Sequence, residues 1–176
     1  IALHGTVGIG KSACAARLAA ELAGTGRVEG FVQRALGRGP PGEGAQAYEL
    51  EFVGSAASRF EARLAWLQRA DGHMPPYRVD AAAEATLAEW LDAVRGDPRE
   101  IDLLLLDEIG QIEARGGGHL QRWQALRALQ PAAVLVVVNT ARLELVEGVL
   151  GQRFDVRIDA AAPDALPCLR DVLLAR

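Results

Sequence analysis

Short apolar runs and longer amphipathic stretches alternate along the chain. The two longest apolar runs, at 103–106 and 132–138, have the length of strands and fall far short of the roughly 18 residues that a membrane-spanning helix needs. The amphipathic stretches predict helices, as where Leu87, Leu91 and Val94 share one face after the capping residue Asp80. The pattern predicts an α/β protein with a mostly parallel sheet. Strands are expected at 1–4, 28–33, 101–106, 133–138 and 154–158, and helices at 13–23, 80–95, 119–129 and 164–174.

The stretch between the second and third of these strands has a different period. Tyr48, Leu50 and Phe52 occupy every second position, and the apolar positions 60, 62, 64 and 66 alternate with the charged positions 59, 61 and 63. A period of two predicts a small antiparallel insertion beside the parallel strands, although positions 57, 60, 64 and 67 also fit a helix. GRGPPGEG at 37–44 predicts a turn or flexible loop. No repeat or linker divides the chain, so we expect a single domain over residues 1–176.

Composition narrows the class of protein further. Of the 176 residues, 50% are hydrophobic but only 5% are aromatic, so Ala, Val, Leu and Ile must form most of the core, with Trp66, Trp90 and Trp123 in packing roles. The net charge of −4 provides no global basic field, which argues against a nucleic-acid partner.

No charged-then-apolar leader opens the chain, so we expect a cytoplasmic protein in which Cys14 and Cys168 are reduced, buried thiols. Because a predicted strand starts at residue 1, we expect the natural chain to begin a few residues earlier.

Residues 5–12 read GTVGIGKS and match the phosphate-binding pattern G-x-x-x-x-G-K-[ST]. In this pattern glycines let backbone N–H groups wrap a β-phosphate, the lysine reaches the β- and γ-phosphates, and the hydroxyl ligates Mg²⁺. An apolar stub precedes the loop and a helix-forming stretch follows it, which is the required order of strand, loop and helix. The predicted nucleotide-binding residues are Gly5, Thr6, Val7, Gly8, Ile9, Gly10, Lys11, Ser12 and Ala13, with Lys11 also catalytic and Ser12 also a metal ligand.

Lys11 is the only lysine of the chain, and all the other basic residues counted among the 19 are arginines. Such a preference for arginine looks like coding bias, so the exception indicates a position that cannot use arginine. A compact ammonium fits between phosphate oxygens where a planar guanidinium does not. A chance match would place the sole lysine at the lysine position of the motif in roughly 1 of 176 arrangements.

Two carboxylates, Asp107 and Glu108, directly follow the predicted strand at 101–106. Ligands of α/β sheets bind at the carboxyl ends of strands. We therefore expect Asp107 to hold Mg²⁺, directly or through water, and Glu108 to orient or deprotonate an attacking water as a catalytic residue. Taken alone, the pair fits a solvated acidic turn equally well. Beside a triphosphate, however, two adjacent acids need a divalent cation to offset their charge.

Asn139 follows the predicted strand at 133–138. A polar side chain at the tip of a neighbouring strand is suited to hydrogen-bond the γ-phosphate or the attacking water, so Asn139 joins the predicted nucleotide-binding residues. The alternative is that Asn139 makes a turn or caps a helix before Leu143.

The chain resembles the small P-loop nucleoside triphosphatases known in animals as cancer-related NTPases and found also in thermophilic microbes. The similarity rests on GTVGIGKS, on EGFVQR at 29–34, on YRVD at 77–80, and above all on LLLLDEIGQIE at 103–113. In that family an acidic DEIG-type tetrapeptide is followed by a short apolar-Glu step. The order and spacing of these segments cover essentially the whole chain.

The resemblance implies a three-layer RecA-like fold with an extra strand between the loop strand and the acidic strand. It also implies Mg²⁺-dependent hydrolysis of ATP, GTP and other nucleoside triphosphates. Family roles carry over to Gly5, Gly10, Lys11 and Ser12 for phosphate and metal, to Asp107 for Mg²⁺ and to Glu108 for water. The chain departs from the family where Val32-Gln33-Arg34 replaces the usual acidic-apolar-Arg stretch, so no role carries over to that segment.

Other functions remain open beside hydrolysis with broad base specificity. A nucleoside or nucleotide kinase is one alternative, because Arg34 and Arg38 beside the 37–44 loop are suited to form a lid over phosphates. Another is a module that binds a protein partner and whose slow turnover only times that interaction. Three arginines are candidates to meet a γ-phosphate: Arg34, Arg115 and Arg142.

Two further classes of nucleotide-binding protein are disfavoured. A GTPase switch needs N-K-x-D after a later strand to select guanine, and residues 139–142 read NTAR instead. A transporter ATPase needs a signature like L-S-G-G-Q, which the sequence lacks.

Overall fold

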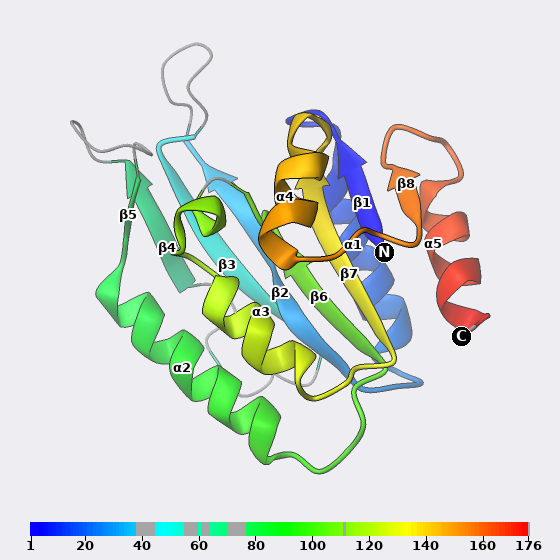
Figure 1. The fold of residues 1–176 in the computed structure, drawn as a ribbon, viewed down its shortest axis with the longest axis horizontal. Coiled ribbons are helices and arrows are strands. Elements are labelled where there is room, and N and C mark those ends of the chain that lie inside the picture. The colour runs from blue at the N-terminus through cyan, green and yellow to red at the C-terminus, as the bar shows by residue number, and fades with distance from the viewer. Residues whose placement is uncertain (38–44, 55–59, 61–63, 70–76, 111, 176) are drawn as a thin grey trace.

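The computed structural model describes residues 1–37, 45–54, 60, 64–69, 77–110 and 112–175. Within these ranges eight strands form one sheet in the order β5-β4-β3-β2-β6-β7-β1-β8 (Figure 1). The elements in chain order are β1 Ala2–Gly5, α1 Lys11–Leu22, β2 Val28–Leu36, β3 Ala47–Gly54, β4 Leu64–Arg69, β5 Tyr77–Val79, α2 Ala81–Gly96, β6 Leu103–Asp107, η2 Glu113–Arg115, α3 Leu120–Arg127, β7 Ala133–Asn139, η3 Thr140–Arg142, α4 Leu143–Leu150, β8 Arg157–Asp159 and α5 Ala165–Leu174.

Five neighbouring strands of the sheet, β2, β6, β7, β1 and β8, pair in parallel. β3, β4 and β5 extend the sheet beyond β2 through antiparallel pairs. The mostly parallel sheet with a small antiparallel insertion, predicted from the change of period, is therefore confirmed. β7 lies between β1 and β6, so the sheet also has the extra strand that the family resemblance implied.

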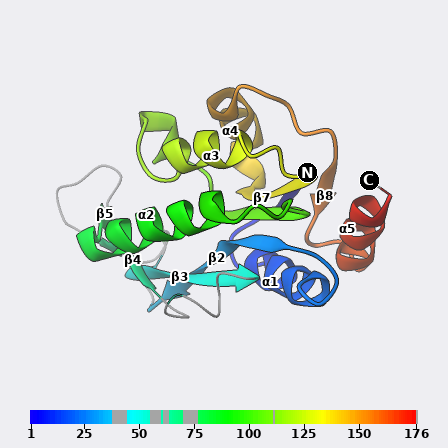
Figure 2. The ribbon, with the colours of Figure 1, turned by 90° about the horizontal axis from the view of Figure 1, so that it is seen from below.

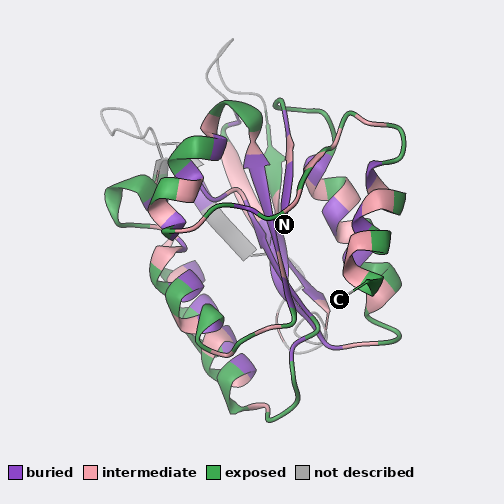
Figure 3. Cartoon of the chain, turned by 45° about the vertical axis from the view of Figure 1, so that its right-hand side comes forward, coloured by how far each residue is buried: buried purple, intermediate pink, exposed green. Residues whose placement is uncertain are grey.

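Helices cover both faces of the sheet and produce three layers (Figure 2). Successive leucines of β6 alternate between the faces. Leu104 and Leu106 join one apolar cluster with residues of α2, α3 and α4, whereas Leu103 and Leu105 join a second cluster with residues of α1 and α5. The central strands are buried from both sides, as their continuous apolar sequence requires (Figure 3).

Most predicted elements are present, with shifts at their ends. Asp80 caps α2 as expected, because its Oδ1 accepts hydrogen bonds from Ala82 N (2.9 Å) and Ala83 N (3.0 Å). The last strand begins at Arg157 rather than at residue 154, and β6 begins at Leu103. β5 was not predicted, because three residues are too few to show a period.

The packing predictions have mixed outcomes. Trp90 and Trp123 are buried in the core, as expected. The prediction that both cysteines are buried is wrong: Cys14 and Cys168 are free and only half-buried, because α1 and α5 are outer-layer helices with one side toward solvent. The loop at 38–44, with Arg38, and the Trp66 side chain lie outside the described parts of the structure.

Candidate active site

The loop between β1 and α1 takes a backbone path that its glycines allow. Gly8 and Gly10 have φ values of +81° and +96°, in the region that side-chain-bearing residues rarely adopt. At Gly5 a Cβ would lie 2.7 Å from Cγ2 of Ile9, so this position has no room for a side chain. Residues 6–10 are exposed to solvent, whereas the next residue, Lys11, is buried.

The first turn of α1 is available to an anion. Gly10 precedes the helix without any side-chain cap, and the first turn carries no acidic residue. Its N–H groups and the positive end of the helix dipole therefore face the loop, as a phosphate site requires. Nζ of Lys11 folds back to donate a hydrogen bond of 2.9 Å to the carbonyl of Thr6, which holds the ammonium at the loop.

Asp107 ends β6 and is fully buried. Its Oδ2 accepts a hydrogen bond from the backbone N–H of Gln33 (2.8 Å), while Oδ1 has no hydrogen-bond partner in the described part of the chain. Burial, and then the neighbouring charge of Glu108, raise the pKa of Asp107 to about 7, against the lowering effects of Ser12, Gln33 and Lys11. A buried carboxylate oxygen without a partner, beside a serine side chain, is what a hard cation needs.

The hydroxyl of Ser12 and the carboxylate of Asp107 are oxygen groups of the kind that bind Mg²⁺, so these two residues fit the role of its ligands. No group of three or more His, Cys, Asp or Glu side chains that could hold a metal ion occurs within the described ranges. A site formed by Ser12 and Asp107 alone would leave its remaining coordination positions to oxygen atoms from water or phosphate. That arrangement suits Mg²⁺, which is usually bound by one or two protein groups together with substrate phosphates and water.

Glu108 has an unusual backbone conformation, with φ of +58°, and its N–H donates to the carbonyl of Val137 (3.0 Å). A non-glycine residue in this region is strained, and such strain is concentrated at functional sites. Burial raises the pKa of Glu108, while the positive charges of Lys11 and Arg142 act to lower it. Lys11 thus lies close enough to act on both the predicted metal ligand Asp107 and the predicted catalytic residue Glu108.

Asn139 lies beside the phosphate loop, because it pairs with Gly5 in the register between β7 and β1. Its Oδ1 accepts a hydrogen bond from the N–H of Ala141 (3.0 Å) and caps the short helix η3. The capping role considered as the alternative is therefore present. Contact of Asn139 with a nucleotide remains a prediction.

Glu113 is a site residue to which the sequence reasoning assigned no role. It is buried, and its two carboxylate oxygens accept hydrogen bonds from the N–H groups of Gly110 (2.7 Å) and His119 (3.0 Å). The bonds tie together the segment that follows Glu108, and the charge of Glu113 also acts to raise the pKa of Glu108. The apolar-Glu step at the end of LLLLDEIGQIE was the available signal.

The three candidate arginines lie in different surroundings. Arg34 forms an ion pair with Glu51 on the neighbouring strand β3. Arg115 is exposed in η2. Arg142 is half-buried and lies over Gly110, where a Cβ would be 3.3 Å from its Nη1.

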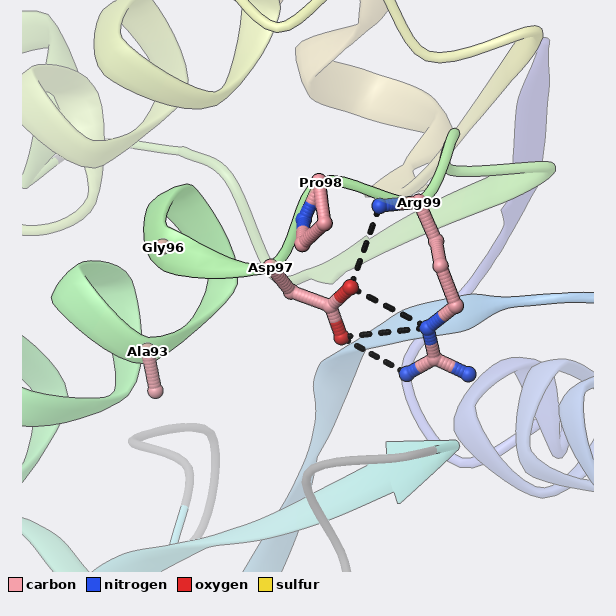
Figure 4. A pocket seen from close by; sticks show the side chains of 5 residues that line it. All are labelled: Ala93, Gly96, Asp97, Pro98 and Arg99. Carbon is pink, nitrogen blue, oxygen red and sulfur yellow. Dashed lines mark hydrogen bonds and ion pairs between the residues drawn. The ribbon is translucent and has the colours of Figure 1, made fainter.

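A separate open pocket lies at the opposite edge of the sheet, where α2 ends and the chain leads into β6 (Figure 4). Its polar groups bond to one another. The Arg99 guanidinium donates to both carboxylate oxygens of Asp97, which lowers the pKa of Asp97. The buried Arg27 guanidinium donates to the carbonyl oxygens of Asp97 (3.2 Å) and Val94 (2.9 Å). This network braces the connection between α2 and β6.

The structure is similar to two solved protein structures. One is the solution structure of a human cancer-related nucleoside triphosphatase, with a TM-score of 0.62 and 18% sequence identity over 99% of this chain and 95% of that chain. The other is the crystal structure of THEP1 from the hyperthermophile Aquifex aeolicus, with a TM-score of 0.63 and 16% identity over 99% and 97% of the two chains. No family model and no curated protein sequence matches the chain.

These likenesses and the strand order define the fold class. The chain has the three-layer α/β fold of the RecA-like P-loop nucleoside triphosphatases, as the sequence resemblance implied. In the described ranges no helix is both long and apolar enough to cross a membrane.

Proposed function

We propose that the protein binds nucleoside triphosphates with Mg²⁺ and hydrolyses them to the diphosphate and inorganic phosphate. The observation that carries the proposal is the buried Oδ1 of Asp107, which has no hydrogen-bond partner in the described part of the chain and lies near Ser12 and Lys11. A Mg²⁺ ion held between this oxygen and phosphate oxygens would supply the positive charge that a buried carboxylate oxygen without a partner needs. The likeness to a solved nucleoside triphosphatase supports the same reading.

Each residue of the site has a distinct task in this proposal. Backbone N–H groups of the phosphate loop and of the first turn of α1 bind phosphate oxygens, and Lys11 leaves the carbonyl of Thr6 to reach the β- and γ-phosphates. Ser12 and Asp107 hold Mg²⁺, which when bound neutralises charge on the β- and γ-oxygens. Glu108 orients the attacking water and accepts its proton, a role for which a carboxyl with a raised pKa is suited.

The proposed base specificity is broad. The chain lacks the N-K-x-D sequence with which GTPase switches select guanine, and the groups assigned to the nucleotide act on its phosphates. We expect kcat/KM for ATP and GTP to agree within about tenfold, which corresponds to about 1.4 kcal/mol. A hundredfold preference for one base, measured in parallel assays, contradicts this part of the proposal.

The proposal is tested by following the γ-phosphate of labelled ATP. The protein is incubated with Mg²⁺ and ATP, alone and with a panel of nucleosides and nucleoside monophosphates. A hydrolase releases labelled inorganic phosphate at the same rate in both arms. Label on an acceptor, or release that requires one, identifies a kinase instead. The kinase alternative places Arg34 in a lid over the phosphates. In the structure Arg34 forms an ion pair with Glu51, and this position does not favour a kinase.

A nucleotide-dependent binding module predicts a third outcome. Such a protein binds ATP tightly and turns it over so slowly that the bound nucleotide only times the interaction with a protein partner. Tight binding with no release by the isolated chain, in either arm of the assay, would favour that function.

A further inference from the structure

Arg142 follows the strand that separates the two halves of the active site. It ends η3, directly after β7, and β7 lies between β1 and β6. The three strands are parallel, so the segments that follow them emerge at the same edge of the sheet. Arg142 therefore leaves the sheet between the segment that carries Lys11 and the segment that carries Glu108.

The backbone that presents Arg142 is fixed by short-range hydrogen bonds. Oδ1 of Asn139 accepts from Ala141 N at 3.0 Å, and the N–H of Leu143 donates to the carbonyl of Thr140. Leu143 is buried at the start of α4. A turn held at both ends places its side chain more precisely than a free loop does.

The guanidinium of Arg142 lies against the acidic segment. A side chain at position 110 would crowd the guanidinium, because a Cβ on Gly110 would lie 3.3 Å from Nη1 of Arg142. Gly110 is itself held by the hydrogen bond from its N–H to Glu113. The positive charge of Arg142 also acts on Glu108, two residues before Gly110.

This guanidinium has no hydrogen-bond or ion-pair partner within the described ranges, although it is only half-exposed. Arg34, by contrast, is paired with Glu51. A guanidinium without such a partner keeps its N–H donors available for an anion. A γ-phosphate bound by Lys11 and faced by Glu108 would be such an anion.

We propose that Arg142 is a catalytic residue that donates hydrogen bonds to the γ-phosphate oxygens in the transition state. The inference rests on the proposed hydrolysis. In that reaction the water oxygen forms a bond to the γ-phosphorus while the bond to the β–γ bridging oxygen breaks. The water proton passes to Glu108, the diphosphate leaves, and the guanidinium stays protonated throughout. The arginine is supplied by the same chain, so turnover needs no partner protein.

The test compares wild type with Arg142→Ala and Arg142→Lys, and uses Arg17→Ala as the control because the Arg17 side chain is 72% exposed on α1 and bonds to Glu21. Calorimetry gives the affinity for ADP and for ADP with aluminium fluoride and Mg²⁺, which mimics the transition state. Phosphate release gives kcat. We expect Arg142→Ala to bind ADP like wild type, to lose the fluoride complex, and to lower kcat on the order of 10³-fold. Arg142→Lys should retain only part of the affinity for the fluoride complex and only part of kcat, because lysine keeps the positive charge but lacks the planar guanidinium.

The outcomes separate this inference from the proposed function. Wild type that releases no phosphate overturns both. Active wild type with an equally active Arg142→Ala variant overturns only the role of Arg142, as does an equal loss of ADP and of the fluoride complex. Loss of kcat in Arg115→Ala instead would assign the role to Arg115. Melting temperatures monitor folding, and Arg142→Gln is measured in place of Arg142→Ala if the alanine variant unfolds.

Discussion

Asp107 and Gln33 are joined across neighbouring strands by a hydrogen bond of 2.8 Å from the Gln33 backbone N–H to Oδ2 of the carboxylate. The parallel pairing of β2 with β6 brings the two residues together. The bond fixes the carboxylate and leaves its Oδ1 without a hydrogen-bond partner in the described part of the chain, as the proposed Mg²⁺ site requires. Because the donor is a backbone N–H, the side chain at position 33 does not matter for it. The departure of Val32-Gln33-Arg34 from the family sequence therefore leaves this contact intact.

Asp107→Asn is expected to change how stability depends on pH in metal-free protein. The pKa of Asp107 is about 7 in the folded state against an ordinary value of 3.8. Between these values the folded state holds a proton that the unfolded chain has released, so the free energy of unfolding falls as pH rises from about 4 to 7. Asparagine does not ionise and removes the contribution of position 107 to this slope, while Glu108, whose pKa is also raised by burial, keeps its own contribution in both proteins. Over that range the variant gains on the order of 4 kcal/mol relative to wild type.

Urea denaturation with a chelator, at several pH values, measures this difference. His119 has a pKa that burial lowers to about 3, so it titrates with the opposite sign, but it is present in both proteins and cancels in the comparison. Parallel pH profiles for the two proteins would show that Asp107 is not buried as a protonated acid.

Glu113→Ala should weaken both the fold and catalysis. The substitution leaves the N–H groups of Gly110 and His119 without their carboxylate acceptor, which costs about 1–3 kcal/mol of unfolding free energy for each buried group left unpaired. We expect kcat to fall as well, because the hydrogen bond between Gly110 and Glu113 holds the segment that follows Glu108. Glu113→Gln keeps one carbonyl acceptor and should lie between wild type and the alanine variant. Denaturation midpoints and phosphate release measure the two effects, and an alanine variant as stable as wild type would refute this role.

Gly30→Ala should destabilise the protein strongly. Gly30 has a φ of +147°, and a Cβ there would lie 1.9 Å from the carbonyl oxygen of Leu105 on the adjacent strand β6. Either the two strands separate or the backbone shifts, at a cost of at least about 3 kcal/mol. Gly148→Ala is the matched control. Gly148 lies in α4 with no atom within 4 Å of the added Cβ, so alanine should stabilise the helix by about 0.5–1 kcal/mol. Equal effects in thermal denaturation would contradict the account of the β2–β6 contact.

The sequence predicted the parts of the site that depend on local pattern. The phosphate loop, with Lys11 and Ser12, has a fixed spacing, and the acids at 107 and 108 end an apolar run that only a buried central strand explains. The apolar-Glu step of the sequence pointed to Glu113, but the hydrogen bonds that Glu113 accepts depend on which N–H groups the folded segment turns toward it. Arg142 was one of three candidate arginines in the sequence, and only the fold distinguishes it from the other two by placing its guanidinium beside Gly110.

Element ends and burial were less predictable for related reasons. β6 starts at Leu103 rather than at residue 101, because strand ends are set by pairing with neighbours and not by the apolar run itself. Cys14 and Cys168 lie on outer-layer helices, where a small residue fits either a buried or a half-exposed position. β5 has too few residues for its alternation to be recognised.

In the proposed reaction Glu108 activates water for attack on a bound nucleoside triphosphate, and Glu108→Gln removes that function alone. The amide preserves size and leaves Lys11, Ser12 and Asp107 in place, but it does not accept the proton of water. ATP affinity from calorimetry should stay within about twofold of wild type, while kcat for phosphate release falls by about 10² or more. Lys11→Ala serves as the opposite control and should lose ATP binding, because no other lysine exists in the chain. A Glu108→Gln variant that releases phosphate at the wild-type rate would contradict the account.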